Sequence, residues 1–303
     1  MQPAETAMPI RLAERMSTWL PVPIVRVEHQ PSGLAPGIRC TLTLADGSRR
    51  FLKAVGDHHN PRSPVIFARE ARINVLLPRM SLRPELAAHL SDGRWELLLF
   101  EHVAGSAWTL GADEPSFERC VASMLRWVDD PLPAPAGLEP LADVETDLFR
   151  GWATLRDAGW PAGSLRSARR LDTLCQLEDE ARAMLAGDTL LHGDLRIDNM
   201  LISEKAVSIV DWAWASRGSP LFDMLTFLND GMVRASALCP RKVADDLVAA
   251  RFPDPAILRG LAALAGFYSH AASRPPVPGL PGLRPFQQRQ AAGFLRWLED
   301  RAP

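Results

Sequence analysis

Two short stretches of the chain carry polar residues at a spacing that can do chemistry. Asp194 follows His192-Gly193, Asn199 lies five residues after Asp194, and Asp211 lies twelve residues after Asn199. Mg²⁺ prefers oxygen ligands and is usually held by one or two carboxylates together with substrate phosphates. A carboxylate on a loop can also orient a substrate hydroxyl for attack. The set therefore predicts kinase-like phosphoryl transfer, with Asp194 acting on the hydroxyl and Asn199 and Asp211 holding a metal.

Apolar runs next to these residues indicate how they are positioned. Asp194 follows Leu190-Leu191, and residues 200–203 and 207–210 form two short runs that predict a small hairpin ending at Asp211. A turn aspartate is the alternative for an isolated His-Gly-Asp, but the matching Asn and Asp favour a catalytic loop. We expect His192 to pack and form hydrogen bonds within that loop, and Asp198 to face away from the metal.

The first hundred residues read as strands with inserted helices. Apolar alternation and turn residues predict strands over residues 22–28, 38–44, 49–55, 85–90 and 95–100, with a hairpin at Asp46-Gly47. Helical spacing predicts helices over residues 8–20 and 64–77. This part of the chain is expected to form one β-rich lobe, residues 1–104.

Beyond Gly105 the pattern becomes mostly helical. Helices are predicted over residues 116–128, 141–158, 167–185, 221–233, 242–250, 255–273 and 286–301. Pro-rich residues 130–140 are expected to be a surface loop, and residues 274–285 a rigid turn-rich loop that either closes over substrate or simply connects two helices. The chain is thus predicted to be an α+β protein of two lobes, with residues 105–303 as the helical catalytic and substrate lobe.

The motifs resemble those of the aminoglycoside phosphotransferase / choline kinase-like family, whose members have the protein-kinase-like fold. His192-Gly193-Asp194 stands where most protein kinases have His-Arg-Asp, and Asp211-Trp212 stands where they have Asp-Phe-Gly. The segment ending at Asp223 resembles the one in which the family places an aspartate that braces the catalytic loop. The resemblance implies an ATP- and Mg²⁺-dependent enzyme that phosphorylates a small-molecule hydroxyl.

The resemblance also assigns roles in the first lobe. Lys53, on the third predicted strand, would hold the α- and β-phosphates of ATP, and Glu70, on the following helix, would position it. A solvated strand lysine is the alternative for Lys53. The backbone of Glu101 and Val103 would bind adenine at the hinge between the lobes.

Two further assignments have ordinary alternatives. Ser32 and Gly33 belong to the segment Ser-Gly-Leu-Ala-Pro-Gly that would cover the phosphates, and a plain Gly/Pro turn is the alternative. Arg196 would offset charge on the transferred phosphate, and a surface arginine is the alternative.

The overall composition of the chain limits the kinds of partner and substrate that it is expected to bind. A formal net charge of -2 predicts neither a nucleic-acid nor a membrane partner. The four cysteines have no CxxC pair and there is no apolar leader, so we expect reduced thiols in a cytoplasmic protein. From Trp212 onward, seven Asp and Glu stand against eleven Lys and Arg, which gives no support for a polycationic acceptor. The acceptor is an antibiotic, such as an aminoglycoside, or a metabolite, and the sequence does not define the oligomeric state.

The sequence disfavours two other functions. A protein kinase is disfavoured because the chain has no GxGxxG between its first two strands and Trp212 follows Asp211. A catalytically idle nucleotide-binding scaffold is disfavoured because Lys53, Glu70, Asp194, Asn199 and Asp211 are all present.

Overall fold

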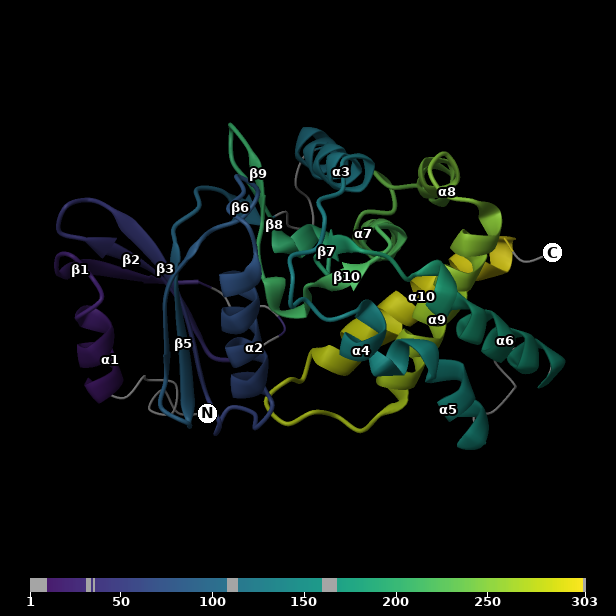
Figure 1. Cartoon of the computed structure of the whole chain (residues 1–303), viewed down its shortest axis with the longest axis horizontal. Helices are drawn as coiled ribbons and strands as arrows, with labels where there is room; N and C mark the ends of the chain where they lie inside the picture. Colours follow the sequence, from purple (N-terminus) through teal and green to yellow (C-terminus); the bar gives the residue numbers. More distant parts are fainter. Residues whose placement is uncertain (1–9, 31–33, 35, 108–113, 160–167, 302–303) are drawn as a thin grey trace.

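The computed structural model describes residues 10–30, 34, 36–107, 114–159 and 168–301. A β-rich lobe and a mostly helical lobe lie side by side, on the left and right of Figure 1. The α+β fold of two lobes predicted from the sequence is confirmed.

The first lobe is built on a five-stranded antiparallel sheet in the order β1-β2-β3-β5-β4. Its strands are β1 Ile24–His29, β2 Ile38–Leu44, β3 Arg49–Gly56, β4 Leu86–Ser91 and β5 Trp95–Glu101. In the predicted hairpin between β2 and β3, Gly47 adopts a positive φ of 82° and the Ser48 carbonyl accepts the Leu44 N–H at 2.8 Å. The hairpin prediction is therefore confirmed.

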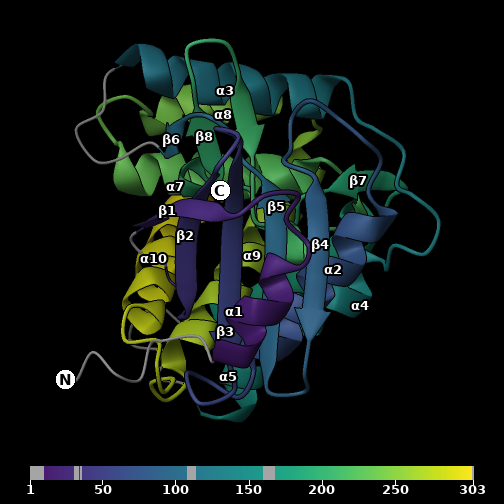
Figure 2. The same ribbon diagram turned by 90° about the vertical axis from the view of Figure 1, so that its left-hand side faces the viewer.

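Helices cover both faces of this sheet (Figures 1 and 2). Alternate residues of β5 point to opposite faces, so Leu97 and Leu99 join the cluster that contains Leu12 of α1 (Ile10–Ser17). Leu98 joins the cluster that contains Phe67 of α2 (Ser63–Leu76). The strand that leads into the linker between the lobes is thus buried from both sides, which fixes the linker's starting point.

The second lobe packs around the Ala-rich helix α9. Its longer helices are α3 Glu114–Asp129, α6 Ala168–Met184, α7 Leu221–Arg234, α8 Arg241–Ala249, α9 Asp254–Ser273 and α10 Leu283–Arg301. Helix α9 is flanked by α10, α6 and α5 (Gly151–Asp157) and buries Leu261 and Leu264 almost completely. This core carries the loops on which the polar motif residues lie.

The prediction of one helix over residues 141–158 is wrong. The segment is divided into α4 Leu141–Val144, the 3-10 helix η2 Thr146–Phe149 and α5 Gly151–Asp157. A Cβ on Gly151 would lie 2.3 Å from the carbonyl group of Gly266, so the chain must change direction here to pass across α9. Glu178 of α6 stabilises the new start, since its carboxylate accepts the Trp152 N–H at 3.0 Å.

Short strands complete the second lobe. The predicted hairpin is present as β8 Met200–Ile202 and β9 Val207–Ile209, joined by β6 Ser106–Ala107, while β7 Thr189–Leu191 pairs with β10 Ser216–Gly218. Residues 130–140 form neither a helix nor a strand and are mostly exposed or half-buried, as expected for a surface loop. The loop is held against the small sheet, since Pro133 is bridged to Thr189 and Pro140 to Arg217, and Leu138 is buried.

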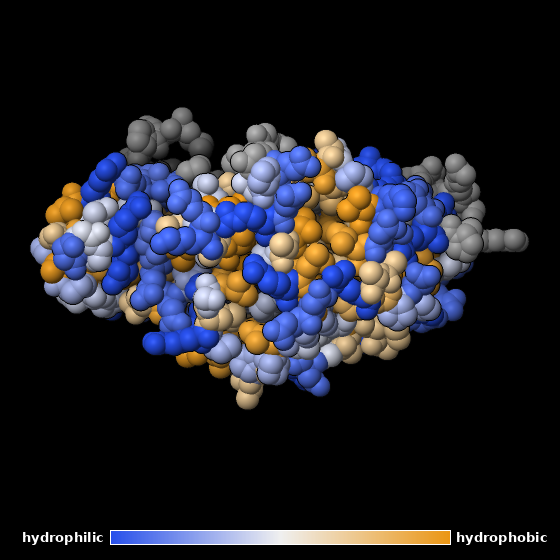
Figure 3. All heavy atoms as spheres, turned by 90° about the horizontal axis from the view of Figure 1, so that it is seen from above, coloured by the Kyte–Doolittle hydropathy of each residue, from blue (hydrophilic) through white to orange (hydrophobic). Residues whose placement is uncertain are grey.

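The surface of the molecule carries both hydrophilic and hydrophobic residues. Seen from above in Figure 3, hydrophilic residues cover much of the face, and hydrophobic ones gather in its middle. Within the described ranges, no helix is both long enough and apolar enough to cross a membrane.

Candidate active site

The loop that carries Asp194 is held by a buried carboxylate. Asp223 on α7 accepts the backbone N–H of His192 at 2.7 Å, the N–H of Gly193 at 3.0 Å and the indole N–H of Trp127 at 3.0 Å. Gly193 has φ 79°, and a Cβ there would meet the carbonyl oxygen of Trp214, so the tight approach requires glycine. Asp223 thus occupies the bracing position that the sequence resemblance implied.

His192 is a structural member of this loop. Its ring is buried, Nε2 lies 3.0 Å from the Val210 carbonyl, and Nδ1 accepts the Asp194 N–H at 3.2 Å. Only the neutral ring protonated at Nε2 can make both bonds. Burial lowers the pKa of His192 to about 4. As expected, it packs and forms hydrogen bonds within the loop.

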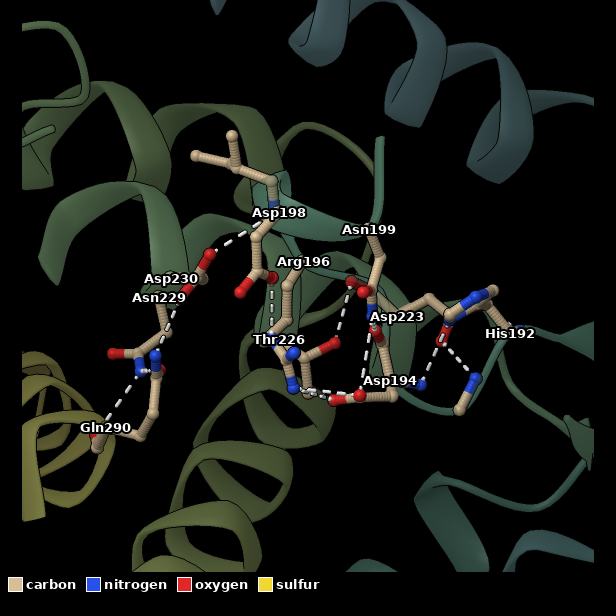
Figure 4. A network of polar contacts seen from close by, with 12 residues as sticks. His192, Asp194, Arg196, Asp198, Asn199, Asp223, Thr226, Asn229, Asp230 and Gln290 are labelled. Carbon is tan, nitrogen blue, oxygen red and sulfur yellow. Dashed lines mark hydrogen bonds and ion pairs between the residues drawn. The ribbon is translucent and has the colours of Figure 1, made fainter. Parts of the chain in front are cut away.

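Asp194 is paired with Arg196. The Arg196 Nη1 atom lies 2.7 and 2.8 Å from the two carboxylate oxygens of Asp194 (Figure 4). Burial raises the pKa of Asp194 to about 7, while the Arg196 guanidinium acts in the opposite direction. The Arg196 side chain is only 11% exposed and stands over the Phe286 ring at 4.9 Å, which excludes the surface alternative for this residue.

A polar network ties Arg196 to the helices behind the loop. Its Nε donates to Asp198, and Asp198 also accepts from Arg234 at 2.8 Å. Asp230 of α7 accepts from Arg234 and from Gln290 of α10, and also takes the N–H of Ile197 at 3.2 Å. Asp198 therefore serves this network, as expected for a residue that faces away from the metal ligands.

Asn199 and Asp211, the two predicted metal ligands, differ in their exposure to solvent. Asn199 is buried, and its amide nitrogen donates to the Asp194 carbonyl at 2.9 Å, so its amide oxygen is the atom offered as a ligand. Asp211 is the one described non-glycine residue with a positive φ, 70°. Its side chain is 38% exposed, so part of the carboxylate is open to a ligand.

The two lobes meet at Lys53. Its ammonium lies 2.8 and 2.9 Å from the Glu70 oxygens and 2.9 Å from Asp211 Oδ1. Its side chain is 8% exposed, so the alternative of a solvated strand lysine is excluded. Burial acts to lower the pKa of Lys53, but the carboxylates of Asp211 and Glu70 outweigh it and raise the value. Lys53 also lowers the pKa of Asp211 against the effect of burial, which keeps that carboxylate ionised.

This donor set fits a divalent ion that brings phosphate oxygens with it. In the described part of the chain, no three His, Cys, Asp or Glu residues gather into a self-sufficient metal site. An amide oxygen and one open carboxylate beside a buried ammonium suit Mg²⁺ bound chiefly through phosphates. The side chains therefore fit both Mg²⁺ and a nucleotide.

The linker between the lobes begins at the expected hinge. Glu101 ends β5, and its N–H is bound to the Glu85 carbonyl at 2.9 Å, while Val103 lies in the extended segment that follows. Gly105 has φ 138°, and a Cβ there would lie 2.8 Å from the Ile202 carbonyl oxygen, so glycine lets the linker pass close to β8. Ser32 and Gly33, assigned to the phosphate-covering segment, lie outside the described residues.

Three residues near Asp194 had little sequence signal. Phe286 contacts Arg196 and lies 6.3 Å from the ring of Tyr268, the chain's single tyrosine. Burial raises the pKa of Tyr268, and the nearby Asp194 carboxylate acts in the same direction. Glu145, at the break between α4 and η2, has a pKa raised to about 8 by burial and by Asp194. These side chains approach Asp194 only because α9, α10 and the α4–η2 break converge there.

Three large aromatic residues of the second lobe belong to its core. Trp152, Phe222 and Phe227 are buried in the core of the second lobe, with exposed fractions of 4% or less. They stabilise the fold and do not line an open surface.

Comparison with known proteins finds one matching sequence family and several similar folds. Residues 66–264 match the sequence model of the phosphotransferase enzyme family. Similar solved structures include aminoglycoside phosphotransferase APH(4)-Ia with ADP and hygromycin B, at 10% identity over 96% of each chain and a TM-score of 0.57. Amicoumacin kinase hAmiN with AMP-PNP and Ca²⁺ shares 13% identity over 98% of this chain and 95% of that chain, with a TM-score of 0.55.

A third similar structure is choline kinase LicA from Streptococcus pneumoniae, at 12% identity, 95% and 98% coverage and a TM-score of 0.60. At such identities the likeness to these structures concerns the fold. No curated protein matches the sequence.

Proposed function

The chain belongs to the phosphotransferase enzyme family, and from this premise we propose that it uses ATP and Mg²⁺ to phosphorylate a hydroxyl group of a small molecule. The proposal is carried by one observation. Lys53 and Glu70 from the first lobe converge on Asp211, while Asp194, Arg196 and Asn199 gather on the neighbouring loop of the second lobe. Phosphoryl transfer depends mainly on such positioning of charges around the phosphates and the attacking oxygen.

In this proposal each residue has a distinct task. Asp194 accepts the hydrogen of the acceptor hydroxyl and aims its oxygen at the γ-phosphate. Arg196 holds the Asp194 carboxylate and, in the ternary complex, neutralises charge on the transferred group. Asn199 and Asp211 would hold Mg²⁺, which neutralises phosphate charge when bound.

The first lobe would bind the nucleotide. Lys53, held by Glu70, takes the α- and β-phosphates, and the backbone of Glu101 and Val103 takes the adenine. Ser32 and Gly33 are proposed to cover the phosphates. The boundary between the nucleotide lobe and the substrate lobe is placed between residues 104 and 105.

The acceptor is proposed to bind beside Asp194, toward α9 and α10. There Tyr268 offers a hydroxyl, Phe286 an aromatic face and Glu145 a carboxyl group. Similar proteins include kinases named for an antibiotic or for choline, so an antibiotic or a metabolite with a free hydroxyl is the proposed acceptor.

Nucleotide binding gives the first test. Wild type and Asp194→Asn are heated with ATP, with and without Mg²⁺, and their melting temperatures are compared. Both proteins should be stabilised by Mg·ATP, because Asp194 has no task in holding the nucleotide. Absence of stabilisation in the wild type would refute the proposed function.

A further inference from the structure

A second link joins helix α2 to the loop that follows Asp211. Arg69 immediately precedes Glu70, and its Nε donates to the carbonyl oxygen of Ala213 at 2.8 Å. Its Nη2 lies 3.5 Å from the carbonyl oxygen of Ala215. Both alanines are buried, so few other donors can reach these carbonyl groups. The same guanidinium stands 5.9 Å from the Trp214 ring.

The loop held in this way begins in an unfavourable conformation. Asp211 adopts φ 70° and ψ 58°, a left-handed conformation that costs a non-glycine residue free energy. It leads directly into the 3-10 helix η5, Trp212–Trp214. A strained residue of this kind keeps its geometry only when the surrounding contacts hold it. The Lys53 ammonium contacts the Asp211 side chain at 2.9 Å and does not hold the backbone that follows Asp211.

Arg69 is also anchored on its other side. Its Nη1 lies 3.3 Å from the Glu139 carboxylate. The backbone carbonyl of Glu139 in turn accepts the N–H of Arg217, which follows the loop, at 2.9 Å. The side chain is 18% exposed, in contrast to Arg72, which is 64% exposed and reaches the same Glu139 oxygen. Arg69 thus lies where α2, η5 and the Pro-rich segment meet.

We propose that Arg69 is a positioning residue that fixes the backbone after Asp211 against α2, so that the Asp211 carboxylate meets the phosphate-bound metal in the correct place. Glu70 and Arg69 then act as neighbouring tethers from one helix, the first through the Lys53 side chain and the second through the main chain of η5. The inference rests on the proposed function, because it assigns Asp211 to the metal.

The test compares Arg69→Met with Arg72→Met. The control variant removes an arginine from the same helix and the same Glu139 partner, but among the described residues Arg72 forms its side-chain hydrogen bond with Glu139 and none with residues 213–215. Calorimetry measures the affinity for ATP with and without Mg²⁺, and hydrogen exchange measures protection of the amides of residues 212–218 in the ligand-free protein. Arg69→Lys keeps the positive charge and one donor nitrogen in place of three, and serves as the conservative variant.

Arg69→Met should bind metal-free ATP as the control does, but should lose at least about tenfold in affinity for Mg·ATP, the usual effect of removing a group that orients a metal ligand. Amide hydrogen exchange of residues 212–218 should also become faster. In both measurements Arg69→Lys should give values between those of the wild type and Arg69→Met. Equal Mg·ATP affinity in Arg69→Met and Arg72→Met would overturn the inference, even if exchange became faster, because Arg69 would then only stabilise the fold. No ATP binding by the wild type would instead overturn the proposed function itself, and the inference with it.

Discussion

At the scale of single residues, the site is a set of charges that depend on one another. Lys53 has two carboxylate partners, and Arg196 holds both oxygens of Asp194. A buried charge left without its partner costs far more than the pair contributes. Substitutions in this site should therefore change both the free energy of unfolding and the enzymatic activity, and suitable variants can separate the two effects.

The Lys53–Glu70 pair offers such a separation. Lys53→Met leaves Glu70 buried without its counter-ion and should lower the free energy of unfolding by about 3 kcal/mol. The double variant Lys53→Met/Glu70→Leu should regain most of that stability but not ATP turnover, because the ammonium group proposed to bind phosphate stays absent. Urea unfolding and ATP consumption measure the two effects. If the double variant is no more stable than Lys53→Met, the pair is not coupled in this way.

His192 should make the fold sensitive to acid. Its pKa is lowered from 6.5 to about 4 in the folded protein, so the unfolded chain takes up the proton first as pH falls. Stability contributed by the neutral ring is complete above pH 6.5 and decreases between about pH 6.5 and pH 4. From pH 7.5 to pH 5 this amounts to about 2 kcal/mol. Urea unfolding across this range should show a steeper loss in wild type than in His192→Gln; parallel curves would contradict the assignment.

At the scale of elements, helices and strands with a regular pattern of apolar residues could be predicted from the sequence. Breaks within such elements could not. The strand over residues 38–44 and the helix ending near Ser273 follow from local alternation and spacing. The break within residues 141–158 depends on Gly151 meeting Gly266, more than a hundred residues away, which leaves no local pattern. Strands of two or three residues, such as β6, are fixed by their partners and carry too few residues for periodicity.

The same contrast applies to the site. Asp194, Asn199, Asp211, Lys53 and Glu70 could be selected from motif spacing and element order. Arg69 and Tyr268 could not, because only tertiary packing brings them near the motif residues.

The crossing of α5 and α9 gives a prediction at this scale. Gly151→Ala would place a Cβ 2.3 Å from the carbonyl carbon and oxygen of Gly266. These are backbone atoms, which cannot move aside as a flexible side chain could. The free energy of unfolding should fall by about 1–3 kcal/mol or more. Gly282→Ala is the matched control, since among the described residues its Cβ would meet Leu34 alone, at an ordinary 3.5 Å. Equal urea midpoints for the two variants would show that the crossing tolerates a methyl group.

At the scale of the whole molecule, the lobes are joined by the linker after Glu101 and by the contacts of Lys53 and Arg69 with the loop that begins at Asp211. A further connection is the segment between α9 and α10, which runs along the bottom of Figure 1 toward the first lobe. Asn60 donates from Nδ2 to the Pro278 carbonyl at 2.9 Å, and Gly279 packs directly on the His59 carbonyl. The segment predicted to be rigid therefore bridges the lobes on the side away from the hinge.

Removing this bridge should loosen the segment. Asn60→Asp keeps the oxygen that accepts the Arg62 N–H but loses the donor to Pro278 and sets a negative charge against that carbonyl. We expect a loss of about 1–2 kcal/mol in stability and faster hydrogen exchange at Leu280 and Leu283. Asn60→Ala should show both losses and also lose the Arg62 contact. Unchanged exchange at Leu280 in both variants would mean that the bridge does not restrain this segment.

Transfer of phosphate to a small molecule is the direct test of whether the two lobes together form a small-molecule kinase. Purified wild type and Asp194→Asn are incubated with Mg²⁺, γ-labelled ATP and a panel of hydroxyl compounds that includes aminoglycosides, macrolides, peptide antibiotics and metabolites. We expect a labelled small-molecule product with wild type and none with Asp194→Asn, although both bind Mg·ATP. A wild type that binds Mg·ATP but labels nothing in the panel would refute this function, as would Asp194→Asn labelling the same product at the wild-type rate.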